Sequence, residues 1–213
     1  LLRRIERNIA YLFTPLGSVD LHEDCVAEGI SSKEITIAEA LKIAGYRTAM
    51  LGKWHLGDYS RQPEFNPRKH GFDQYFGVPH SNDMQPCPLF RNETQLEADI
   101  GTNQARLTGM YTEEALAFIE KLKDSPFFLY FAHTFPHQPL YASEKFSGKS
   151  KAGKFGDAVE EIDWSVAEII KKLRERKIEQ NTLILFTSDN GPWYEGSPGA
   201  FRGRKGQSYE GGF

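Results

Sequence analysis

Long hydrophobic runs are missing from this chain of 213 residues. The longest mostly apolar stretches, residues 127–132 and 183–186, fall far short of the roughly 20 residues that cross a bilayer. An excess of basic charge is missing as well, because 26 Lys and Arg stand against 29 Asp and Glu. The sequence therefore predicts no transmembrane segment, and its net charge of −3 argues against general nucleic-acid binding.

Cysteine is scarce, since the chain has only Cys25 and Cys87. Two cysteines are too few for a disulfide scaffold, and they leave one bridge or none as open alternatives. Neither has the CxxC partner of a zinc ribbon. An uninterrupted apolar segment after Leu1 is also missing, so no signal peptide is visible. We expect the chain to be incomplete at both ends.

The residues that are present favour one globular domain. Hydrophobic residues make up 39% and aromatic residues 13% of the chain, which argues against disorder. The length suits a single domain. We therefore treat residues 1–213 as one domain with an irregular or atypical stretch over 1–32. Residues 58–110, rich in Pro, Asn, Gly and Arg, are expected to form a loop-rich insertion that shapes ligand specificity.

Helical and strand patterns alternate along the chain. A capping box from Thr36 to Glu39 begins a short helix that Gly45 ends, and a strand pattern follows over 46–51. Two further helices are predicted, one capped by Thr112 and one over 159–173. Apolar strand patterns occupy residues 127–132 and 182–187, and 72–78 adds a shorter one. This alternation predicts an α/β fold with a mostly parallel sheet buried on both faces.

A polar loop follows each of the three helix–strand pairs. Open α/β sheets bind ligands at the carboxyl ends of their strands. We therefore expect the side chains of these loops to converge there, although they are far apart in sequence: Lys53, His55, His133, His137, Asp189 and Asn190.

Each loop has a chemical and a purely structural interpretation. Asp189 and Asn190 offer adjacent hard oxygen donors suited to Ca²⁺ or Mg²⁺, but Asp-Asn-Gly is also an ordinary turn. Lys53 and His55, two apart in an extended loop, are placed to face one anion; the alternative is a surface lysine beside a packed Trp54–His55 pair. A phosphate-binding P-loop is excluded, because the glycine spacing is wrong and Trp54 replaces the hydroxyl residue.

Two further segments carry weaker signals. His137 lies between two prolines, which restrict the backbone and hold the ring in place, although a lone histidine is commonly structural. The basic, glycine-rich segment 202–206 is able to hold an oxyanion or to form a solvated loop.

The four segments together are specific. GKWHLG (52–57), FPHQP (135–139), TSDNGP (187–192) and RKGQSYEGG (204–212), in this order, resemble the sulfatase family. The similarity spans roughly residues 33–213 and is strongest to the branch that holds arylsulfatase A and N-acetylgalactosamine-6-sulfatase. It implies an alkaline-phosphatase-like α/β fold, of which the chain is a partial catalytic domain. It also implies hydrolysis of a sulfate ester by a formylglycine hydrate, with Ca²⁺, or Mg²⁺ in its place.

The resemblance also implies roles for individual residues. Asp189 and Asn190 match Ca²⁺ ligands, and Lys53 and Lys205 match sulfate-binding lysines. His55 matches a histidine beside the formylglycine, His137 matches a candidate proton donor near the leaving oxygen, and Ser81 matches a substrate-side position. The implied partners are a sulfated small molecule or glycan and a formylglycine-generating or sulfatase-maturing enzyme. Family analogy indicates a periplasmic, secreted or lysosomal location.

The departure from the family concerns the nucleophile. The signature Cys/Ser-x-Pro-Ser-Arg and the paired aspartates of the Ca²⁺ site are absent from these 213 residues. Cys25 does not begin such a signature. Cys87 has Arg91 at the right distance but lacks the Pro and Ser, so we interpret it as a disulfide or buried thiol.

Two alternatives to an active sulfatase follow from this departure. One is a truncated, inactive homologue that binds sulfated glycans. A phosphoryl-transfer relative is disfavoured, because GKWHLG is a sulfatase motif. Asn92 begins an Asn-Glu-Thr sequon, which is a glycan site only in a secretory eukaryotic protein.

Overall fold

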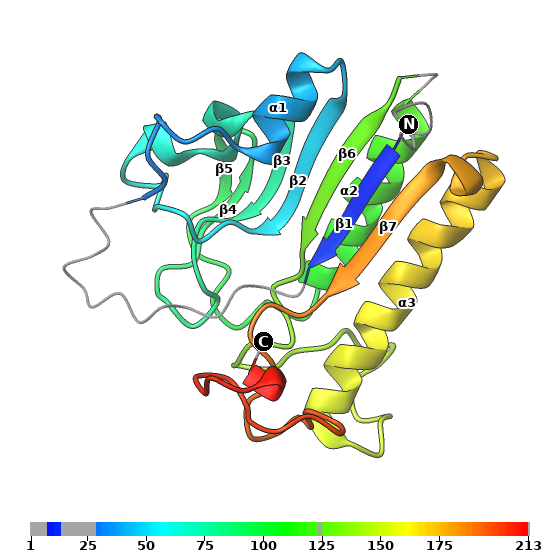
Figure 1. Cartoon of the computed structure of the whole chain (residues 1–213). Coiled ribbons are helices and arrows are strands. Elements are labelled where there is room, and N and C mark those ends of the chain that lie inside the picture. Colours follow the sequence, from blue (N-terminus) through cyan, green and yellow to red (C-terminus); the bar gives the residue numbers. More distant parts are fainter. Residues whose placement is uncertain (1–7, 14–28, 123–124, 213) are drawn as a thin grey trace.

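A seven-stranded sheet organises the protein (Figure 1). The computed structural model describes residues 8–13, 29–122 and 125–212. The strands lie in the order β5-β4-β3-β2-β6-β1-β7. Neighbouring pairs among β3, β2, β6, β1 and β7 are parallel, whereas β4 and β5 add an antiparallel hairpin. The bounds are β1 (Asn8–Phe13), β2 (Arg47–Lys53), β3 (Gln74–Val78), β4 (Leu89–Arg91), β5 (Thr94–Glu97), β6 (Phe127–Ala132) and β7 (Thr182–Thr187).

Three α-helices accompany the sheet: α1 (Ile37–Ile43), α2 (Leu107–Lys121) and α3 (Gly153–Glu175). The capping box of α1 forms as predicted, because Thr36 Oγ1 accepts from the Glu39 N–H at 3.1 Å and Glu39 Oε2 accepts from the Thr36 N–H at 2.8 Å. No helix in the described ranges is long and apolar enough to cross a bilayer.

The predicted start of α2 was wrong. Thr112 does not cap the helix but lies inside it, where its hydroxyl donates to Thr108 O at 2.7 Å and lies 2.6 Å from Ser165 Oγ of α3. The hydroxyl is therefore satisfied by the preceding turn and by the facing helix. A threonine satisfied in this way is compatible with a helix interior.

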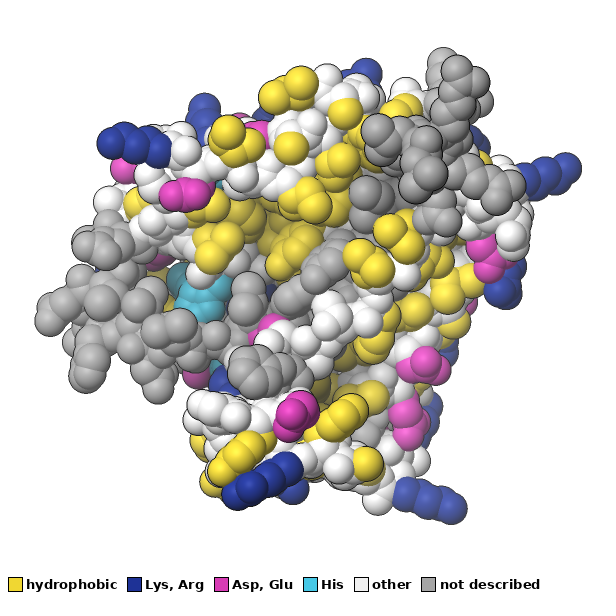
Figure 2. All heavy atoms as spheres, in the orientation of Figure 1, with side chains coloured by type: hydrophobic (Ala, Val, Ile, Leu, Met, Phe, Trp, Pro, Cys, Tyr) yellow, Lys and Arg dark blue, Asp and Glu magenta, His cyan; other side chains and the backbone are white. Residues whose placement is uncertain are grey.

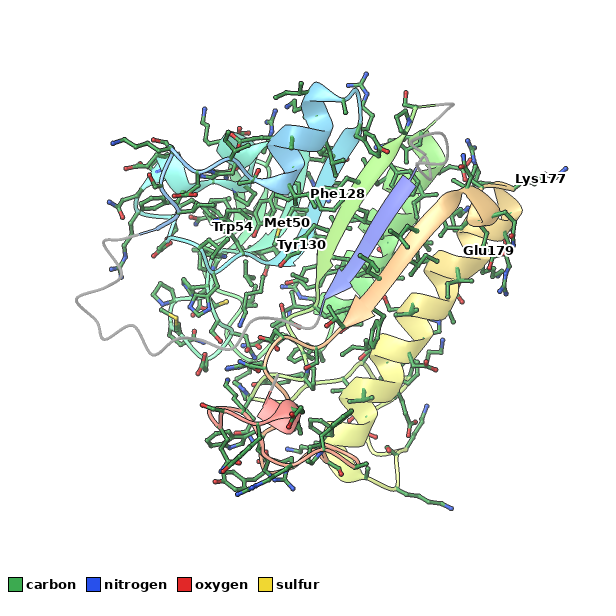
Figure 3. All side chains as sticks on the ribbon, viewed as in Figure 1. Met50, Trp54, Phe128, Tyr130, Lys177 and Glu179 are labelled. Atoms are coloured by element: carbon green, nitrogen blue, oxygen red, sulfur yellow. The ribbon has the colours of Figure 1, made fainter. Side chains whose placement is uncertain are left out.

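Alternating side chains place two cores on the two faces of the sheet. Phe127, Leu129 and Phe131 of β6 join a cluster with residues of α2 and α3. Phe128 and Ala132 face the other way and join a cluster that includes Ala38 of α1. Figure 3 shows four residues on this second side: Met50, Trp54, Phe128 and Tyr130. The period of two is the one that a pleated strand imposes.

The predicted burial of both sheet faces is incomplete at β7. Leu183 and Leu185 are each 40% exposed and Phe186 is 60% exposed, whereas Ile184 packs against the core shared with α2 and α3. Ile37 and Ile43 of α1 are exposed too. Figure 2 shows hydrophobic side chains at the surface on this side of the molecule. The side chains of Leu183 and Leu185 are therefore only partly covered by the described residues.

The expected irregular stretch over 1–32 contains a strand. β1 pairs in parallel with β6 on one side and β7 on the other, over all six of its residues. The apolar run from Ile9 to Phe13 was the available signal. It is short, and the surrounding charged residues obscured it. The correction matters for the fold, because within the described ranges β7 is an edge strand that pairs with β1 alone.

The predicted loop-rich insertion over 58–110 also contains regular structure. β3 lies within the predicted 72–78, and the hairpin of β4 and β5 extends the sheet beyond it. Asn92, the first residue of the sequon, lies in the turn of this hairpin with a positive φ of 55°. Its Oδ1 accepts from the Tyr75 N–H at 3.0 Å. Asn92 therefore has a structural role that joins the hairpin to β3.

The strands approach closely where β2 ends. Gly52 has φ of +102°, and a Cβ there would lie 1.7 Å from Ala132 O of β6. Gly77 of β3 is as constrained, since its Cβ would lie 1.8 Å from Gly52 O. Glycine is required at both positions to keep the three strand ends together.

We predict that Gly52→Ala lowers the free energy of unfolding by about 3 kcal/mol or more, because it adds both backbone strain and a clash with the Ala132 carbonyl. Gly109→Ala is the control: it lies in α2 with nothing within 4 Å of an added Cβ. This second change should stabilise the protein by about 0.5–1 kcal/mol. Urea unfolding measures both, and equal effects of the two substitutions would contradict the strand register.

Candidate active site

Strand register sets the positions of the candidate site residues. Lys53 ends β2 opposite Val78, which ends β3. β2 and β6 end within one residue of each other, and Phe13 of β1 pairs with both Ala132 and Thr187, which end β6 and β7. The carboxyl ends of the parallel strands therefore lie at one edge of the sheet, the edge where open α/β sheets bind ligands.

Lys53, at the end of β2, and His55, in the loop that follows, lie on either side of the buried Trp54. The Trp54 N–H donates to Val78 O at 3.0 Å, and the His55 N–H donates to Pro79 O at 2.9 Å. The indole of Trp54 packs among the aromatic residues of the core (Figure 3). These contacts hold the loop against the end of β3 and leave Lys53 and His55 near each other, with Asp83 acting on the pKa of both.

Lys53 is a buried cation rather than the surface lysine of the alternative interpretation. Its side chain is 3% exposed, and burial lowers its pKa to about 8. Asp189 and Asp83 oppose this shift, whereas Lys205 adds to it. Residues from three distant segments therefore meet around the Lys53 ammonium, which is mostly charged at neutral pH.

Two imidazoles lie near this cation. Burial lowers the pKa of His55 to about 4, and Lys53, His80 and His137 act in the same direction. Burial also lowers the pKa of His137, with Lys53 as the next cause. Both rings are therefore mainly neutral at pH 7. A bound anion would favour their protonated forms, because opposite charges stabilise each other.

The ring of His137 is held by the loop around it. Its Nδ1 lies 2.6 Å from Gln138 O, 3.1 Å from Asn82 Oδ1 and 3.4 Å from Ser81 Oγ. Ser81 is buried and comes from the segment after β3. The structure thus brings the predicted substrate-side serine into contact with the predicted proton donor.

The loop after β7 supplies the remaining site residues. A pocket of about 600 Å³ is lined by His137, Asp189, Asn190 and Lys205, among others. Burial raises the pKa of Asp189 to about 6, whereas Lys53 and Lys205 lower it. The backbone N–H of Lys205 donates to Pro192 O at 3.1 Å, which folds the distal loop back over the end of β7. Lys53 and His55 do not line this pocket but lie near it: Lys53 lowers the pKa of His137 and of Asp189, and His137 lowers the pKa of His55.

Three residues with predicted chemical roles lie elsewhere. His133 is completely buried, stacks on Phe131 with ring centroids 4.1 Å apart, and has its pKa lowered to about 3 by burial. Its expected convergence with the other polar residues is wrong, because its side chain enters the core. Of the basic segment 202–206, Arg202 lies 3.9 Å over the Tyr209 ring, and Arg204 donates to Trp193 O at 2.9 Å. Lys205 is the basic residue of this segment that lines the pocket.

Apart from Ser81, the polar residues that follow β3 were not predicted as site residues. His80 and Asp83 act on the pKa of His55, and Asp83 acts on that of Lys53. Burial raises the pKa of Asp83, but a hydrogen bond with Ser81, the nearby His137 ring and the charge of Lys53 together lower it below its usual value. The available signal was the run His80-Ser81-Asn82-Asp83 directly after a strand.

The cysteine nearest to a nucleophile signature is buried and inert. Cys87 is a free thiol at the start of the β4 hairpin, and burial raises its pKa to about 12. A thiol with so high a pKa is a poor nucleophile. Of the two alternatives predicted for Cys87, a disulfide or a buried thiol, the buried thiol is confirmed. Cys25 lies outside the described residues.

The donors at the end of β7 fit part of a Ca²⁺ site. Asp189 and Asn190 offer adjacent oxygens in the pocket, and a cation bound to Asp189 would offset the cost of burying its charge. Ca²⁺ takes about six to eight oxygen ligands. Within the described ranges, no group of three or more His, Cys, Asp and Glu is arranged to hold a metal. This pair therefore supplies a fraction of such a shell.

Comparison with known proteins identifies the class. The sulfatase family model matches residues 9–213. The chain is 41% identical over 206 residues to N-acetylgalactosamine-6-sulfatase of Rattus norvegicus and 34% identical over 212 residues to arylsulfatase A of Homo sapiens. Each match covers 86% of this chain, and 39% and 42% of the respective relative. The chain belongs to the sulfatase family and spans about two fifths of the length of these curated relatives.

Solved structures share the fold. The PsFucS1 sulfatase from Pseudoalteromonas sp. matches with a TM-score of 0.76 and 26% identity, covering 94% of this chain and 46% of that one. A Bacteroides thetaiotaomicron structure described for the metabolism of multiple glycosaminoglycans matches with a TM-score of 0.76 and 26% identity, covering 85% and 53%. The predicted sulfatase fold, α/β with a mostly parallel sheet, is confirmed.

The pKa of Lys53 predicts a pH dependence of anion binding. Lys53 is charged below about pH 8 and neutral above it, so sulfate affinity should fall between pH 7 and pH 9. In Lys53→Ala the affinity should be weak throughout and change little over this range. Calorimetric titration with sodium sulfate at constant ionic strength measures both curves. If sulfate affinity falls equally in Lys53→Ala between pH 7 and pH 9, a group other than Lys53 causes the pH dependence.

Proposed function

We propose that this chain is the part of a sulfate-ester hydrolase that binds the sulfate group and the leaving alcohol. The observation that carries the proposal is the meeting of Lys53, Lys205, His137 and Asp189 at the carboxyl edge of the sheet, as their mutual effects on pKa indicate. Family membership supports the same reaction class. The nucleophile is not among these 213 residues.

The charges suit the chemistry of sulfate transfer. Negative charge develops on the sulfuryl oxygens and on the leaving oxygen, so fixed positive charge stabilises the transition state. Lys53 and Lys205 would supply it from two distant segments of the chain. Their rigid placement matters, because preorganised charges cost no reorganisation during the reaction.

The two histidines would handle protons. His137 lines the pocket, where its imidazolium form would donate a proton to the leaving alcohol oxygen. Since its pKa is lowered, a bound anion or acidic pH would be needed to populate that form. His55 lies near Lys53 and would act at the nucleophile side, with its ring neutral in the anion-free site.

Asp189 and Asn190 would hold a Ca²⁺ ion, with Mg²⁺ as the alternative. When bound, the ion would supply a further positive charge to the sulfuryl oxygens. The formylglycine of the family would come from a segment outside this sequence, through a formylglycine-generating or sulfatase-maturing enzyme.

Names of the relatives support a sulfated glycan or small molecule as the substrate class. The matches include a sugar sulfatase and arylsulfatases, and one solved structure is described for glycosaminoglycan metabolism. Family analogy supports a periplasmic, lysosomal or secreted location for such an enzyme.

Sulfate binding tests the proposed site. We expect Lys53→Ala and Lys205→Ala each to weaken sulfate binding about ten- to hundred-fold, the loss typical of a charge-assisted contact. Lys171→Ala, an exposed lysine of α3, is the matched control and should leave affinity unchanged. Equal losses in all three variants would show that only net charge matters and would reject the site. Aryl sulfate hydrolysis by the longest reading frame that contains this chain separates an enzyme from a homologue that only binds.

Calcium binding tests the metal ligands. Asp189→Ala should abolish the stabilisation of the chain by millimolar Ca²⁺ in thermal unfolding, because it removes the carboxylate ligand. Asp163→Ala, an exposed aspartate of α3, should keep it. The comparison is made at pH 7.5, where Asp189 is ionised. If Ca²⁺ stabilises both variants as it stabilises the unchanged chain, Asp189 is not a ligand and the ion binds at another place.

A further inference from the structure

A buried pair of carboxamides stands behind His137. Asn82, which follows β3, is 0% exposed, and Gln104, which precedes α2, is 1% exposed. Asn82 Nδ2 donates to Gln104 Oε1 at 2.9 Å and to Pro139 O at 3.1 Å. Gln104 Nε2 donates to Asn82 O and to Gly101 O, each at 2.9 Å. Neither residue belongs to the sulfate or metal contacts proposed above.

Backbone carbonyls determine which way each amide points. A carbonyl oxygen accepts hydrogen bonds and never donates them. One end of the Gln104 amide faces the backbone oxygens of Asn82 and Gly101, so this end is the NH₂ group. The amide oxygen of Gln104 therefore faces the side chain of Asn82. Pro139 O likewise requires the NH₂ group of Asn82. The Asn82 amide oxygen is therefore the atom that faces His137.

This polarity extends to the imidazole. His137 Nδ1 lies 3.1 Å from Asn82 Oδ1 and 2.6 Å from Gln138 O, both of which are acceptors. Ser81 Oγ at 3.4 Å is able to accept or donate. A ring nitrogen between two acceptors must carry a hydrogen. Nδ1 is then protonated in both the neutral and the charged ring, and only Nε2 gains and loses a proton.

We propose that Asn82 and Gln104 are positioning residues that hold His137 in its Nδ1–H tautomer, so that Nε2 is the nitrogen that exchanges a proton with the ligand in the pocket. The importance of this tautomer for hydrolysis rests on the proposed function. Gln104 acts through Asn82 and touches no ligand. The pair comes from the insertion over 58–110, which thus contributes to the orientation of a catalytic group.

Side-chain ¹⁵N chemical shifts of His137 in the whole chain test the proposal, because protonated and unprotonated ring nitrogens differ in shift. The signals are assigned by their loss in His137→Asn. We expect the neutral ring to show protonated Nδ1 and unprotonated Nε2. Asn82→Leu should lower the ratio of the Nδ1–H to the Nε2–H tautomer by about five-fold, the effect of one lost neutral hydrogen bond.

Three further variants separate positioning from general damage to the fold. Asn82→Asp keeps an acceptor for Nδ1 and should keep the tautomer, although it disturbs the amide pair as Asn82→Leu does. Gln104→Leu should lower the ratio by a smaller factor, because Asn82 Nδ2 then keeps the hydrogen bond to Pro139 O but loses the one to Gln104 Oε1. Gln180→Leu, an exposed glutamine before β7, is the matched control and should change nothing.

A neutral wild-type ring with hydrogen on Nε2 would overturn the proposal, whether or not any variant folds. A retained Nδ1–H tautomer in folded Asn82→Leu would overturn it as well. The spectra are recorded without sulfate. A failure of sulfate binding would therefore count against the proposed function and leave the tautomer result standing.

Discussion

Parallel hydrogen bonding brings the carboxyl ends of β2, β3 and β6 to one edge of the sheet. The position of the candidate site depends on this close packing of three strand ends. The backbones approach so closely that a single methyl group at Gly52 would overlap the Ala132 carbonyl. Three loops therefore leave the sheet side by side. They carry Lys53, the segment that follows β3, and His137. β1 extends the arrangement to β7 and thus to Asp189.

A buried positive charge is the second consequence of this arrangement. Burying an ammonium group costs free energy, which appears as the lowered pKa of Lys53. Asp83 and Asp189 offset part of the cost from two different loops. The protein thus keeps a cation, two mainly neutral imidazoles and a carboxylate with a raised pKa in close proximity. Such a concentration of perturbed groups is typical of functional sites and is unfavourable for stability alone.

Local patterns predicted the regular elements well where the signal was long or unambiguous. The strands at 127–132 and 182–187 have the predicted bounds, and the capping box of α1 forms as expected. The start of α2, the strand β1 and the hairpin of β4 and β5 were missed. Thr112 has the chemistry of a cap, but it lies inside α2, where its hydroxyl donates to Thr108 O of the preceding turn and contacts Ser165 of α3. Short strands leave little periodicity to read, and their existence depends on the neighbours that they pair with.

The sequence by itself determined the fold class, the sulfatase resemblance and the residue types of the site, because these depend on residue identity, order and local spacing. Tertiary structure decided which of those residues meet. His133 and His137 are four positions apart in one polar loop, yet one ring stacks on Phe131 in the core and the other lines the pocket. Gln104 carries no local signal, and Asn82 carries only its place in the polar run after β3. Their role arises because distant backbone carbonyls require their NH₂ groups, and a hydrogen bond across such a distance in sequence is visible only when the chain is folded.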